Sequence, residues 1–501
     1  MDILNIFKEL KKLIPKDFFS KIENPLYQLL ISNKKLSSFL IFKKQIGKII
    51  ISVDEIKLLF FIGIILTKYS CFFQSLVIFY YCLRKDKSNP DAYFNIALCL
   101  KNLNRYRIAI FYFTKQKNLY GESTKVIYEL AKCNQIVGNL KAAEKLFFKL
   151  FSSEPTNFSE EHKEYSTIHK YTENDPHLNI LRDLRNNNSL QDKNKKFIFF
   201  ALSKAYEDLK DYRQSFENLK LGNKLRKNEL DYSSDIIKNQ FYSIKSAFEN
   251  GLNQKNFDIK EKSKLPVHIV GLPRSGTTLL EQIISSHSKV YSMAESLVFP
   301  SLIKRYFPSN DPEKFKNELI NINQKIVFKF REEYFKEQFK NTKKDIITDK
   351  LPFNFIFLGL INKIIPESKI IHIKRNARDT CISILKNYFI GKNINFAYDE
   401  KDIVDYFFQY QDLMKFWKNK CSDQFLEIDY EDLINNFDFS IKKVLNFVNL
   451  DYESNLEKFY QNKSSVFSLS LAQVRMPIYK TSIKNWKNFE PYLSEEFKKL
   501  I

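Results

Sequence analysis

The chain has 501 residues, with 80 Lys and Arg against 58 Asp and Glu, which gives a formal net charge of +22. A hydrophobic fraction of 44% is too high for a disordered chain and too low for a protein with many membrane spans. The length suggests two to three domains. The charge invites a nucleic-acid interpretation, but only 13 of the 80 basic residues are Arg, and we expect most Lys to be solvated on helix surfaces. Because no basic–aromatic motif accompanies the charge, we predict no nucleic-acid partner.

The six cysteines form no Cys-x-x-Cys pair, and none has a His at zinc-ligand spacing. We therefore predict no metal site and interpret the cysteines as small core residues in a reducing compartment. The first twelve residues lack the apolar stretch of a signal peptide, and the longest apolar run, Leu58 to Leu66, is shorter than the roughly 20 residues of a membrane span. These features predict a soluble, cytoplasmic protein without a transmembrane segment.

The first half of the chain repeats itself at a step of 34 residues. The recurring positions are a small set (Gly63, Ala97, Ala131), a large set (Phe72, Tyr106, Leu140) and a second small set (Ser75, Ala109, Ala143). Small residues allow two helices to approach closely, a large residue fills the groove between them, and stacked units bury a continuous core. The phase is lost over residues 158–196, after which Ser203, Tyr212 and Ser215 restore it.

This pattern resembles tetratricopeptide repeats. We therefore predict a helical segment at residues 1–54 and a tetratricopeptide-like solenoid over residues 55–250. The resemblance implies a surface that binds an acceptor or a partner protein. A plain structural scaffold is the alternative.

The second half begins with a short β-branched run from Pro266 into a glycine-containing loop, Gly271-Leu-Pro-Arg-Ser-Gly-Thr-Thr278, and then a helical pattern. A strand, a glycine loop and a helix form the arrangement that cradles phosphate groups. The loop fits a Walker A motif except that Thr277 stands where that motif has Lys. The cation lies inside the loop instead, at Arg274, which favours a different phosphate-like group.

A second segment completes the pattern: a strand from Ile370 to Arg375 is followed by Ser383 eight residues after the Arg. Together the two segments resemble the donor-binding motifs of sulfotransferases, which use 3′-phosphoadenosine 5′-phosphosulfate as co-substrate. The resemblance implies that Arg375 and Ser383 hold the 3′-phosphate, and an ion pair of Arg375 with Asp379 is the alternative. It also assigns the 5′-phosphosulfate to the loop residues, which are Gly271, Pro273, Arg274, Ser275, Gly276, Thr277 and Thr278.

Further positions are similar to the protein-tyrosine sulfotransferases. In that branch a Glu 21 residues after the loop Arg is the general base, which corresponds to Glu295 here. A Lys-x-Pro segment corresponds to Lys350, whose ammonium would stabilise the departing charge together with Arg274. Three histidines are the rival bases: His268, His287 and His372.

The remaining donor contacts implied by the resemblance lie toward the C-terminus. Tyr430 belongs to a Tyr-Glu-x-Leu segment, and a closing loop contributes Ser470, Arg475 and Lys484. One departure is Asn387, which occupies the place of a further Arg in the tyrosine branch.

We therefore predict a helical solenoid followed by a P-loop-like three-layer α/β sulfotransferase domain with a mostly parallel sheet over residues 260–501. The predicted reaction is sulfuryl transfer to an acceptor hydroxyl on a protein, with tyrosine as one option, or on a glycan or a small molecule. The alternatives are a P-loop kinase or NTPase and a non-enzymatic scaffold. No sequence feature indicates an oligomeric state.

Overall fold

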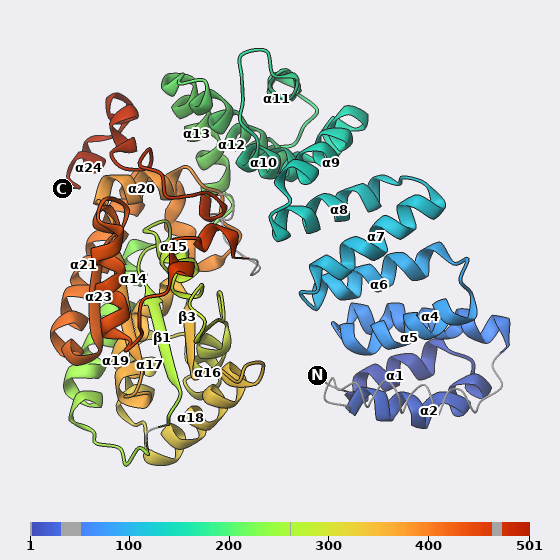
Figure 1. Ribbon diagram of the computed structural model, residues 1–501, viewed down its shortest axis with the longest axis horizontal. Coiled ribbons are helices and arrows are strands. Elements are labelled where there is room, and N and C mark those ends of the chain that lie inside the picture. The colour runs from blue at the N-terminus through green and yellow to red at the C-terminus, as the bar shows by residue number, and fades with distance from the viewer. Residues whose placement is uncertain (1–2, 32–51, 261, 463–472, 501) are drawn as a thin grey trace. The chain divides into compact units, whose positions relative to one another are not determined.

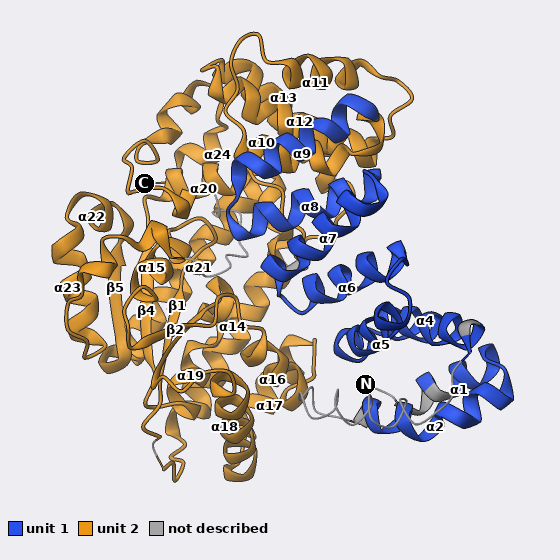
Figure 2. Ribbon diagram, turned by 45° about the vertical axis from the view of Figure 1, so that its right-hand side comes forward, with its two compact units in different colours: residues 1–153 blue, residues 154–501 orange. Residues whose placement is uncertain are grey.

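The computed structural model describes residues 3–31, 52–260, 262–462 and 473–500. The chain divides into two compact units, residues 1–153 and residues 154–501, coloured separately in Figure 2. Each unit has its own hydrophobic clusters. None of the described helices is long and apolar enough to cross a lipid bilayer.

The described residues of the first unit form helices that follow one another in a stack (Figure 1). They are α1 (Ile3–Leu13), α2 (Lys16–Ile31), α4 (Val53–Lys68), α5 (Phe72–Lys85), α6 (Pro90–Asn102), α7 (Tyr106–Tyr120), α8 (Thr124–Val137) and α9 (Leu140–Ser153). The large residues of the 34-residue pattern are the first residues of α5, α7 and α9. The predicted helix-rich N-terminal region is confirmed.

The small residues of the pattern lie where helices touch. Ala97 and Ala109 are fully buried on the paired helices α6 and α7. A Cβ added to Gly63 would lie 2.6 Å from the Phe79 ring, so only Gly permits this contact between α4 and α5. Helix starts are also specified locally, since Ser52 and Glu55 form a capping box at α4.

Five α-helices precede the first strand of the second unit: α10 (Ser159–Ile168), α11 (Pro176–Asn186), α12 (Asp192–Asp208), α13 (Tyr212–Lys227) and α14 (Ser234–Asn250). The restored repeat phase corresponds to α12 and α13, where Ser215 Oγ donates to the Ser203 carbonyl oxygen at 2.7 Å. Phe197 of α12 packs against Tyr388, with ring centroids 4.8 Å apart, so these helices share a core with the sheet domain. The domain boundaries predicted at residues 54, 250 and 260 remain predictions.

A five-stranded sheet forms the centre of the second unit, in the order β2-β3-β1-β4-β5. The strands are β1 (Leu265–Val270), β2 (Val290–Ser292), β3 (Ile346–Lys350), β4 (Lys369–Lys374) and β5 (Phe425–Asp429). All four pairings are parallel, and five of the six residues of the central strand β1 are buried. A parallel sheet needs helices on both faces to bury such strands.

One face of the sheet packs on α15 (Thr277–Ile284), α22 (Tyr430–Asn435) and α23 (Phe437–Phe447), through a cluster that includes Ile269 and Ile371. Figure 2 shows α22 and α23 beside β5. The other face, with Val270 and Ile370, packs on a larger group of helices. That group includes α14, α16 (Val298–Tyr306), α17 (Pro312–Ile320), α18 (Gln324–Phe339), α19 (Leu358–Ile364), α20 (Ala377–Leu385) and α21 (Glu400–Lys420). The predicted fold class, helices followed by a three-layer α/β domain, is confirmed.

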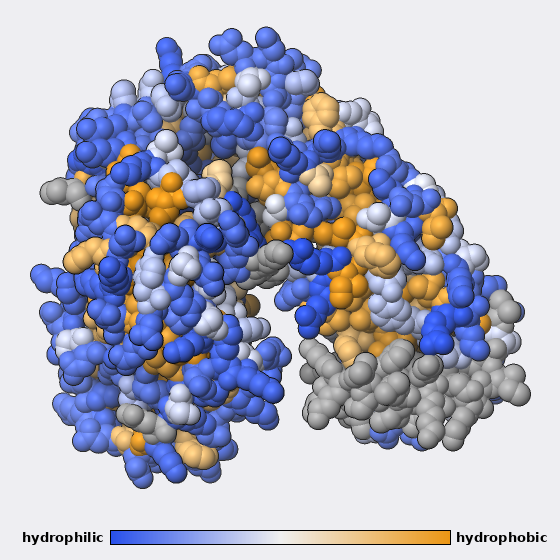
Figure 3. Space-filling view, viewed as in Figure 1, coloured by the Kyte–Doolittle hydropathy of each residue, from blue (hydrophilic) through white to orange (hydrophobic). Residues whose placement is uncertain are grey.

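The two units differ in the surfaces they present in Figure 3. The second unit is mostly hydrophilic in that view, whereas hydrophobic residues gather on the first unit over the helices labelled α6 and α7 in Figure 1. Three of the exposed apolar side chains of the first unit lie on α7: Ile108, Phe111 and Leu119. The first unit therefore carries exposed apolar side chains outside its core.

Candidate active site

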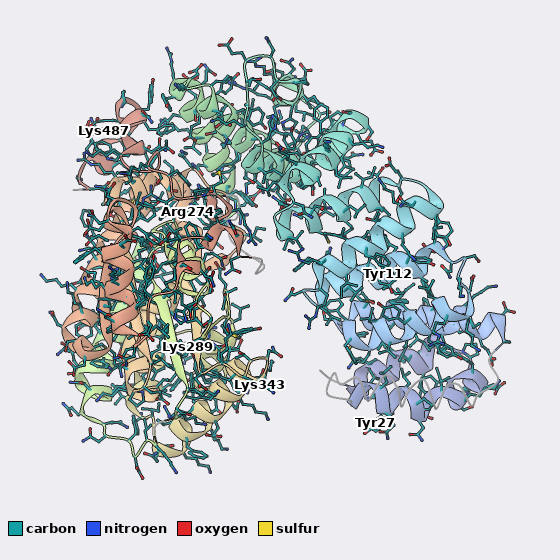
Figure 4. The ribbon with its side chains drawn as sticks, in the orientation of Figure 1. Tyr27, Tyr112, Arg274, Lys289, Lys343 and Lys487 are labelled. Carbon is teal, nitrogen blue, oxygen red and sulfur yellow. The ribbon has the colours of Figure 1, made fainter. Side chains whose placement is uncertain are left out.

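The predicted site residues gather at the carboxyl edge of the parallel sheet. The phosphate loop leaves β1, Lys350 is the last residue of β3, and Arg375 directly follows β4. Figure 4 shows Arg274 toward one end of the sheet and Lys289 and Lys343, which precede β2 and β3, toward the other end. Ligands of open α/β sheets bind at the carboxyl ends of the strands, so this edge is where a site is expected.

The phosphate loop is tight enough to require both of its glycines. Gly271 has φ +156°, and a Cβ there would lie 2.6 Å from the Ile373 carbonyl oxygen. Gly276 has φ +106°, and a Cβ there would lie 2.5 Å from Cδ2 of Tyr430. Arg274 also has a positive φ of 72°. The backbone of this loop is therefore held in conformations that bring it close to its neighbours.

Polar groups of the loop face a space that suits an anion. Ser275 is 2% exposed, and its Oγ has no hydrogen-bond partner among the described residues. Thr277 and Thr278 are the first residues of the eight-residue helix α15. Amides at a helix N-terminus and an unpaired buried hydroxyl are groups that a phosphate or a sulfuryl oxygen satisfies.

The two motif arginines contact each other's segments. Arg274 Nε donates to Ser383 Oγ at 3.1 Å, and Arg375 Nη1 donates to the Arg274 carbonyl oxygen at 2.9 Å. Burial lowers the pKa of Arg274 to about 10, and the Arg375 guanidinium lowers it as well. A buried Arg274 guanidinium whose charge is disfavoured by its surroundings forms a site that a multiply charged anion would stabilise.

The alternative role of Arg375, an ion pair with Asp379, does not occur. Arg375 donates to the main-chain carbonyl oxygens of Arg274 and Ser482, and its guanidinium lies 4.9 Å from the centroid of the Tyr430 ring. Asp379 is buried and accepts the backbone N–H groups of Lys484 at 2.7 Å and Trp486 at 3.0 Å. Asp379 therefore anchors the C-terminal segment and leaves Arg375 facing the loop.

Residues of the C-terminal segment form hydrogen bonds with both arginines. Gln473 Oε1 accepts from Arg274 Nη2 at 2.9 Å, and the Ser482 carbonyl oxygen accepts from Arg375 Nη2 at 2.6 Å. The Tyr430 hydroxyl lies 2.9 Å from Ser482 Oγ. Sequence reasoning named neither Gln473 nor Ser482 as a contact, and an uncharged Gln or Ser in a polar segment gives no signal that could have singled it out.

The other predicted residues of this segment are placed as follows. Ser470 lies outside the described residues. Arg475 ends a short 3-10 helix (Gln473–Arg475) and is partly buried. Lys484 has a positive φ of 61° and contributes its backbone N–H to Asp379. Tyr479 belongs to the same cluster. Burial raises its pKa to about 12, and among its neighbours Tyr430 raises this pKa while Arg274 and Arg375 lower it.

A Lys–Glu pair lies two strands away from Arg375. Lys350 is 2% exposed, and its Nζ donates to Glu295 Oε1 at 2.7 Å. The Glu295 side chain is 36% exposed and follows Ala294, which has a positive φ of 50°. A third charged group, Glu281 of α15, lies 4.0 Å from Lys350 Nζ. The structure thus brings the predicted base and the predicted cation into direct contact, which their spacing in the sequence does not specify.

The three histidines considered as alternative bases are all buried. His268 is fully buried with neither ring nitrogen hydrogen-bonded among the described residues, and burial lowers its pKa to about 3. His287 contacts the Asp451 carbonyl oxygen at 3.0 Å, and His372 contacts the Tyr410 hydroxyl at 2.5 Å. Glu295 is more exposed than any of these rings.

Two basic residues near the second motif, Arg378 and Lys386, interact with other parts of the second unit. Arg378 donates to the Leu500 carbonyl oxygen at 2.6 Å and lies over the Trp486 ring at 4.5 Å. Lys386 pairs with Glu207 of α12. Asn387, which stands in place of an Arg of the tyrosine branch, donates to the Ser383 carbonyl oxygen at 2.7 Å.

A hollow of about 900 Å³ adjoins the arginine cluster, between the sheet edge and α21. Its lining includes Ser275 and Arg375 but neither Lys350 nor Glu295. Charged side chains of both signs line it, and Lys374 and Glu427 are paired there at 2.7 Å. Among the described residues, no group of three or more His, Cys, Asp and Glu side chains is arranged to hold a metal ion.

This part of the chain is similar to known proteins. Residues 266–454, which contain both motifs and the Lys–Glu pair, match the model of the sulfotransferase family. This part of the second unit is therefore similar to the sulfotransferase family. Protein-tyrosine sulfotransferase 1 of Danio rerio is 22% identical over 259 residues, which cover 49% of this chain and 72% of that protein.

A second relative extends into the helical array. A protein of Aquifex aeolicus (strain VF5), named only as uncharacterized, is 27% identical over 426 residues, which cover 82% of this chain and 56% of the relative. The matched part of this chain thus spans little more than half of that relative. Among solved structures, the sulfotransferase domain of the Synechococcus PCC 7002 olefin synthase is similar with a TM-score of 0.34 at 16% identity, over 49% of this chain and 97% of that domain.

Proposed function

We propose that the protein transfers a sulfuryl group from 3′-phosphoadenosine 5′-phosphosulfate to an acceptor hydroxyl. The observation that carries the proposal is the arrangement at the sheet edge: the Arg274 loop is joined to Arg375 and Ser383 on one side, and the Lys350–Glu295 pair lies on the other. A P-loop NTPase would need a Lys where this loop has Thr277. The kinase alternative therefore lacks its central cation.

The donor-binding roles follow from the groups that this edge presents. In this proposal the loop amides, Ser275 Oγ and the start of α15 bind the 5′-phosphosulfate, which supplies the transferable sulfuryl group. Arg375 and Ser383 bind the 3′-phosphate, and the Tyr430 ring lies 4.9 Å from the Arg375 guanidinium. The orphan Ser275 hydroxyl and the two glycine positions without room for a Cβ fit a bound anion.

The proposed chemistry uses the exposed carboxylate and the buried ammonium. Glu295 takes the proton of the acceptor hydroxyl as the new O–S bond forms. As the S–O bond to the 5′-phosphate breaks, its electron pair stays on the phosphate oxygen, where Lys350 and Arg274 stabilise the charge. Glu295 and Lys350 are 2.7 Å apart, so one side chain can accept a proton while its neighbour supplies positive charge.

We propose a protein tyrosine as the acceptor and the helical array as the surface that binds the acceptor protein. The Danio rerio relative is a protein-tyrosine sulfotransferase, which supports the first part. The first unit also carries most of the net positive charge of the chain, because residues 1–153 contain 25 Lys and Arg against 11 Asp and Glu. Such a surface suits an acidic polypeptide. We also propose a cytoplasmic location, which is supported by six buried cysteines that form no disulfide.

The test is a binding and transfer experiment with the purified chain. Calorimetry should show binding of adenosine 3′,5′-bisphosphate and at least tenfold weaker binding of ATP. Incubation with donor carrying labelled sulfate should then label tyrosine peptides more strongly than saccharides or small alcohols. Labelling of only the latter classes would overturn the acceptor assignment, and tight ATP binding without bisphosphate binding would overturn the reaction.

A further inference from the structure

We propose that Glu281 is a positioning residue for the proposed reaction: it keeps the Lys350 ammonium charged and in place while Glu295 takes up the acceptor proton. The inference rests on the proposed function and adds a residue that neither motif includes. Glu281 lies on α15, three residues after Thr278 and therefore about one turn beyond the phosphate loop.

Glu281 is fixed in the interior by hydroxyl groups. It is 2% exposed, and its Oε1 accepts from Ser292 Oγ at 2.8 Å and from Thr348 Oγ1 at 3.4 Å. Its other oxygen, Oε2, is directed to Lys350 Nζ at 4.0 Å. The carboxylate thus has one oxygen held by neutral donors and one oxygen facing the buried cation.

The same network reaches the segment that carries Glu295. Ser292 Oγ, which donates to Glu281, accepts the backbone N–H of Ala294 at 3.1 Å. Ala294 has a positive φ of 50° and immediately precedes Glu295. Glu281 therefore contacts Lys350 directly and braces the turn before Glu295 through one hydroxyl.

The charges explain why a second carboxylate is needed. Lys350 is as buried as Glu281, and a buried ammonium is costly without an anion beside it. When Glu295 binds a proton it becomes neutral, and Lys350 loses the partner at 2.7 Å. Glu281 then remains as the anion next to the ammonium. The charged groups against Lys350 are Glu281 from α15 and Glu295 from the loop after β2.

The neighbours of Glu281 also act on its protonation. Burial raises the pKa of Glu281 above its usual value and the Glu295 carboxylate raises it as well, whereas Lys350 and the hydroxyls of Ser292 and Thr348 lower it. Asp349, the neighbour of Lys350 on β3, is hydrogen-bonded to Tyr334 and Gln338 of α18 and so faces the opposite layer. Glu281 is accordingly a buried carboxylate on the Lys350 side of the sheet.

The test is Glu281→Gln, which keeps the shape and the hydroxyl contacts but removes the charge. We expect kcat to fall at least tenfold, the affinity for adenosine 3′,5′-bisphosphate to stay within threefold, and the alkaline limb of the kcat profile to move to lower pH by at least half a unit. Glu281→Asp should restore part of kcat. Glu129→Gln, which removes the charge of a buried carboxylate that pairs with the partly exposed Lys101 of the first unit, is the matched control and should leave the profile unchanged.

A second measurement separates this inference from the proposed function. In urea unfolding, the effects of Glu281→Gln and Lys350→Met on the unfolding equilibrium constant should be non-multiplicative by at least fivefold in the double mutant. If the wild type transfers no sulfate, the proposed function is wrong, but the coupling still shows whether Glu281 and Lys350 interact. Multiplicative effects, or a Glu281→Gln enzyme with an unmoved alkaline limb, would overturn the inference.

Discussion

Arg375 donates a hydrogen bond from Nη1 to the main-chain carbonyl oxygen of Arg274, at 2.9 Å, across 101 residues of sequence. The contact joins the phosphate loop after β1 to the end of the neighbouring strand β4. It sets the two guanidiniums beside each other, and Arg274 in turn reaches Ser383 of the second motif. The contact thereby stabilises the phosphate loop at Arg274, where the backbone has a positive φ, through a residue at the end of the neighbouring strand.

Removing the Arg375 side chain should weaken donor binding specifically. A charge-assisted hydrogen-bonded contact of this kind contributes about 1.5–3 kcal/mol. We therefore expect Arg375→Ala to weaken the affinity for adenosine 3′,5′-bisphosphate by roughly 10- to 150-fold in calorimetry. Arg378→Ala is the matched control, because Arg378 binds the C-terminal carbonyl oxygens of Leu500 and Lys498. Equal losses of affinity in both variants would contradict the assignment.

The loop glycine at position 276 should not tolerate a side chain. Gly276→Ala combines a φ of +106° with a Cβ 2.5 Å from the Tyr430 ring. We expect it to lower the free energy of unfolding by about 1–3 kcal/mol and to abolish bisphosphate binding. Gly391→Ala is the control, since φ there is −73° and nothing lies within 4 Å of the added Cβ. Urea unfolding of both variants decides the matter, and an unchanged midpoint for Gly276→Ala would count against the loop geometry.

A buried imidazole pair in the second unit should make stability depend on pH. His162 Nδ1 and His177 Nε2 are 2.7 Å apart, and burial lowers the pKa values to about 4 and about 2. The unfolded chain takes up protons on these histidines near pH 6.5, whereas the folded chain does not. The free energy of unfolding is therefore highest above that pH and decreases as the pH falls. Each group contributes a slope of about 1.4 kcal/mol per pH unit.

The measurement compares wild type with His177→Gln in urea unfolding between pH 6 and pH 4.5. The variant should lose less stability on acidification by roughly the slope of one group. Identical slopes in the two proteins would show that His177 is not buried in its neutral form.

Asp349 should have the opposite effect on how stability depends on pH. Burial raises its pKa to about 7, although the Tyr334 hydroxyl and the Gln338 amide donate to it. The folded chain keeps a proton that the unfolded chain releases near pH 4, so stability is lost as pH rises from about 4 to about 7. Asp349→Asn should therefore gain stability relative to wild type between pH 5 and pH 7 in urea unfolding. A difference that does not change with pH would refute this.

Local sequence patterns predict the framework well because their determinants are short-range. The strand before Gly271 and the helix after Gly276 are visible as an apolar run, two glycines and a helical pattern, and β1 and α15 lie there. The small residues Ala97 and Ala109 likewise mark helix contacts, because packing permits nothing larger. The strand ends then bring Arg274 and Arg375 together through the parallel topology.

Contacts that depend on tertiary folding were not predictable in the same way. Asp379 pairs with the backbone of Lys484 and Trp486 instead of with Arg375, and Arg378 serves the C-terminus. The gathering of His162 and His177 depends on how α10 and α11 pack, which repeat phase does not encode over this stretch. Glu281 has no motif of its own, and only its burial beside Lys350 reveals it.

The most direct measurement is the transfer of labelled sulfate from 3′-phosphoadenosine 5′-phosphosulfate to tyrosine peptides by wild type and by Glu295→Gln. Wild type should label the peptides, and the variant should lose at least a hundredfold in kcat, which is within the range of general-base catalysis. The variant should still bind adenosine 3′,5′-bisphosphate, and Glu332→Gln, on the exposed face of α18, should match wild type. Equal labelling by wild type and Glu295→Gln, or no labelling together with no bisphosphate binding, would contradict the proposed reaction.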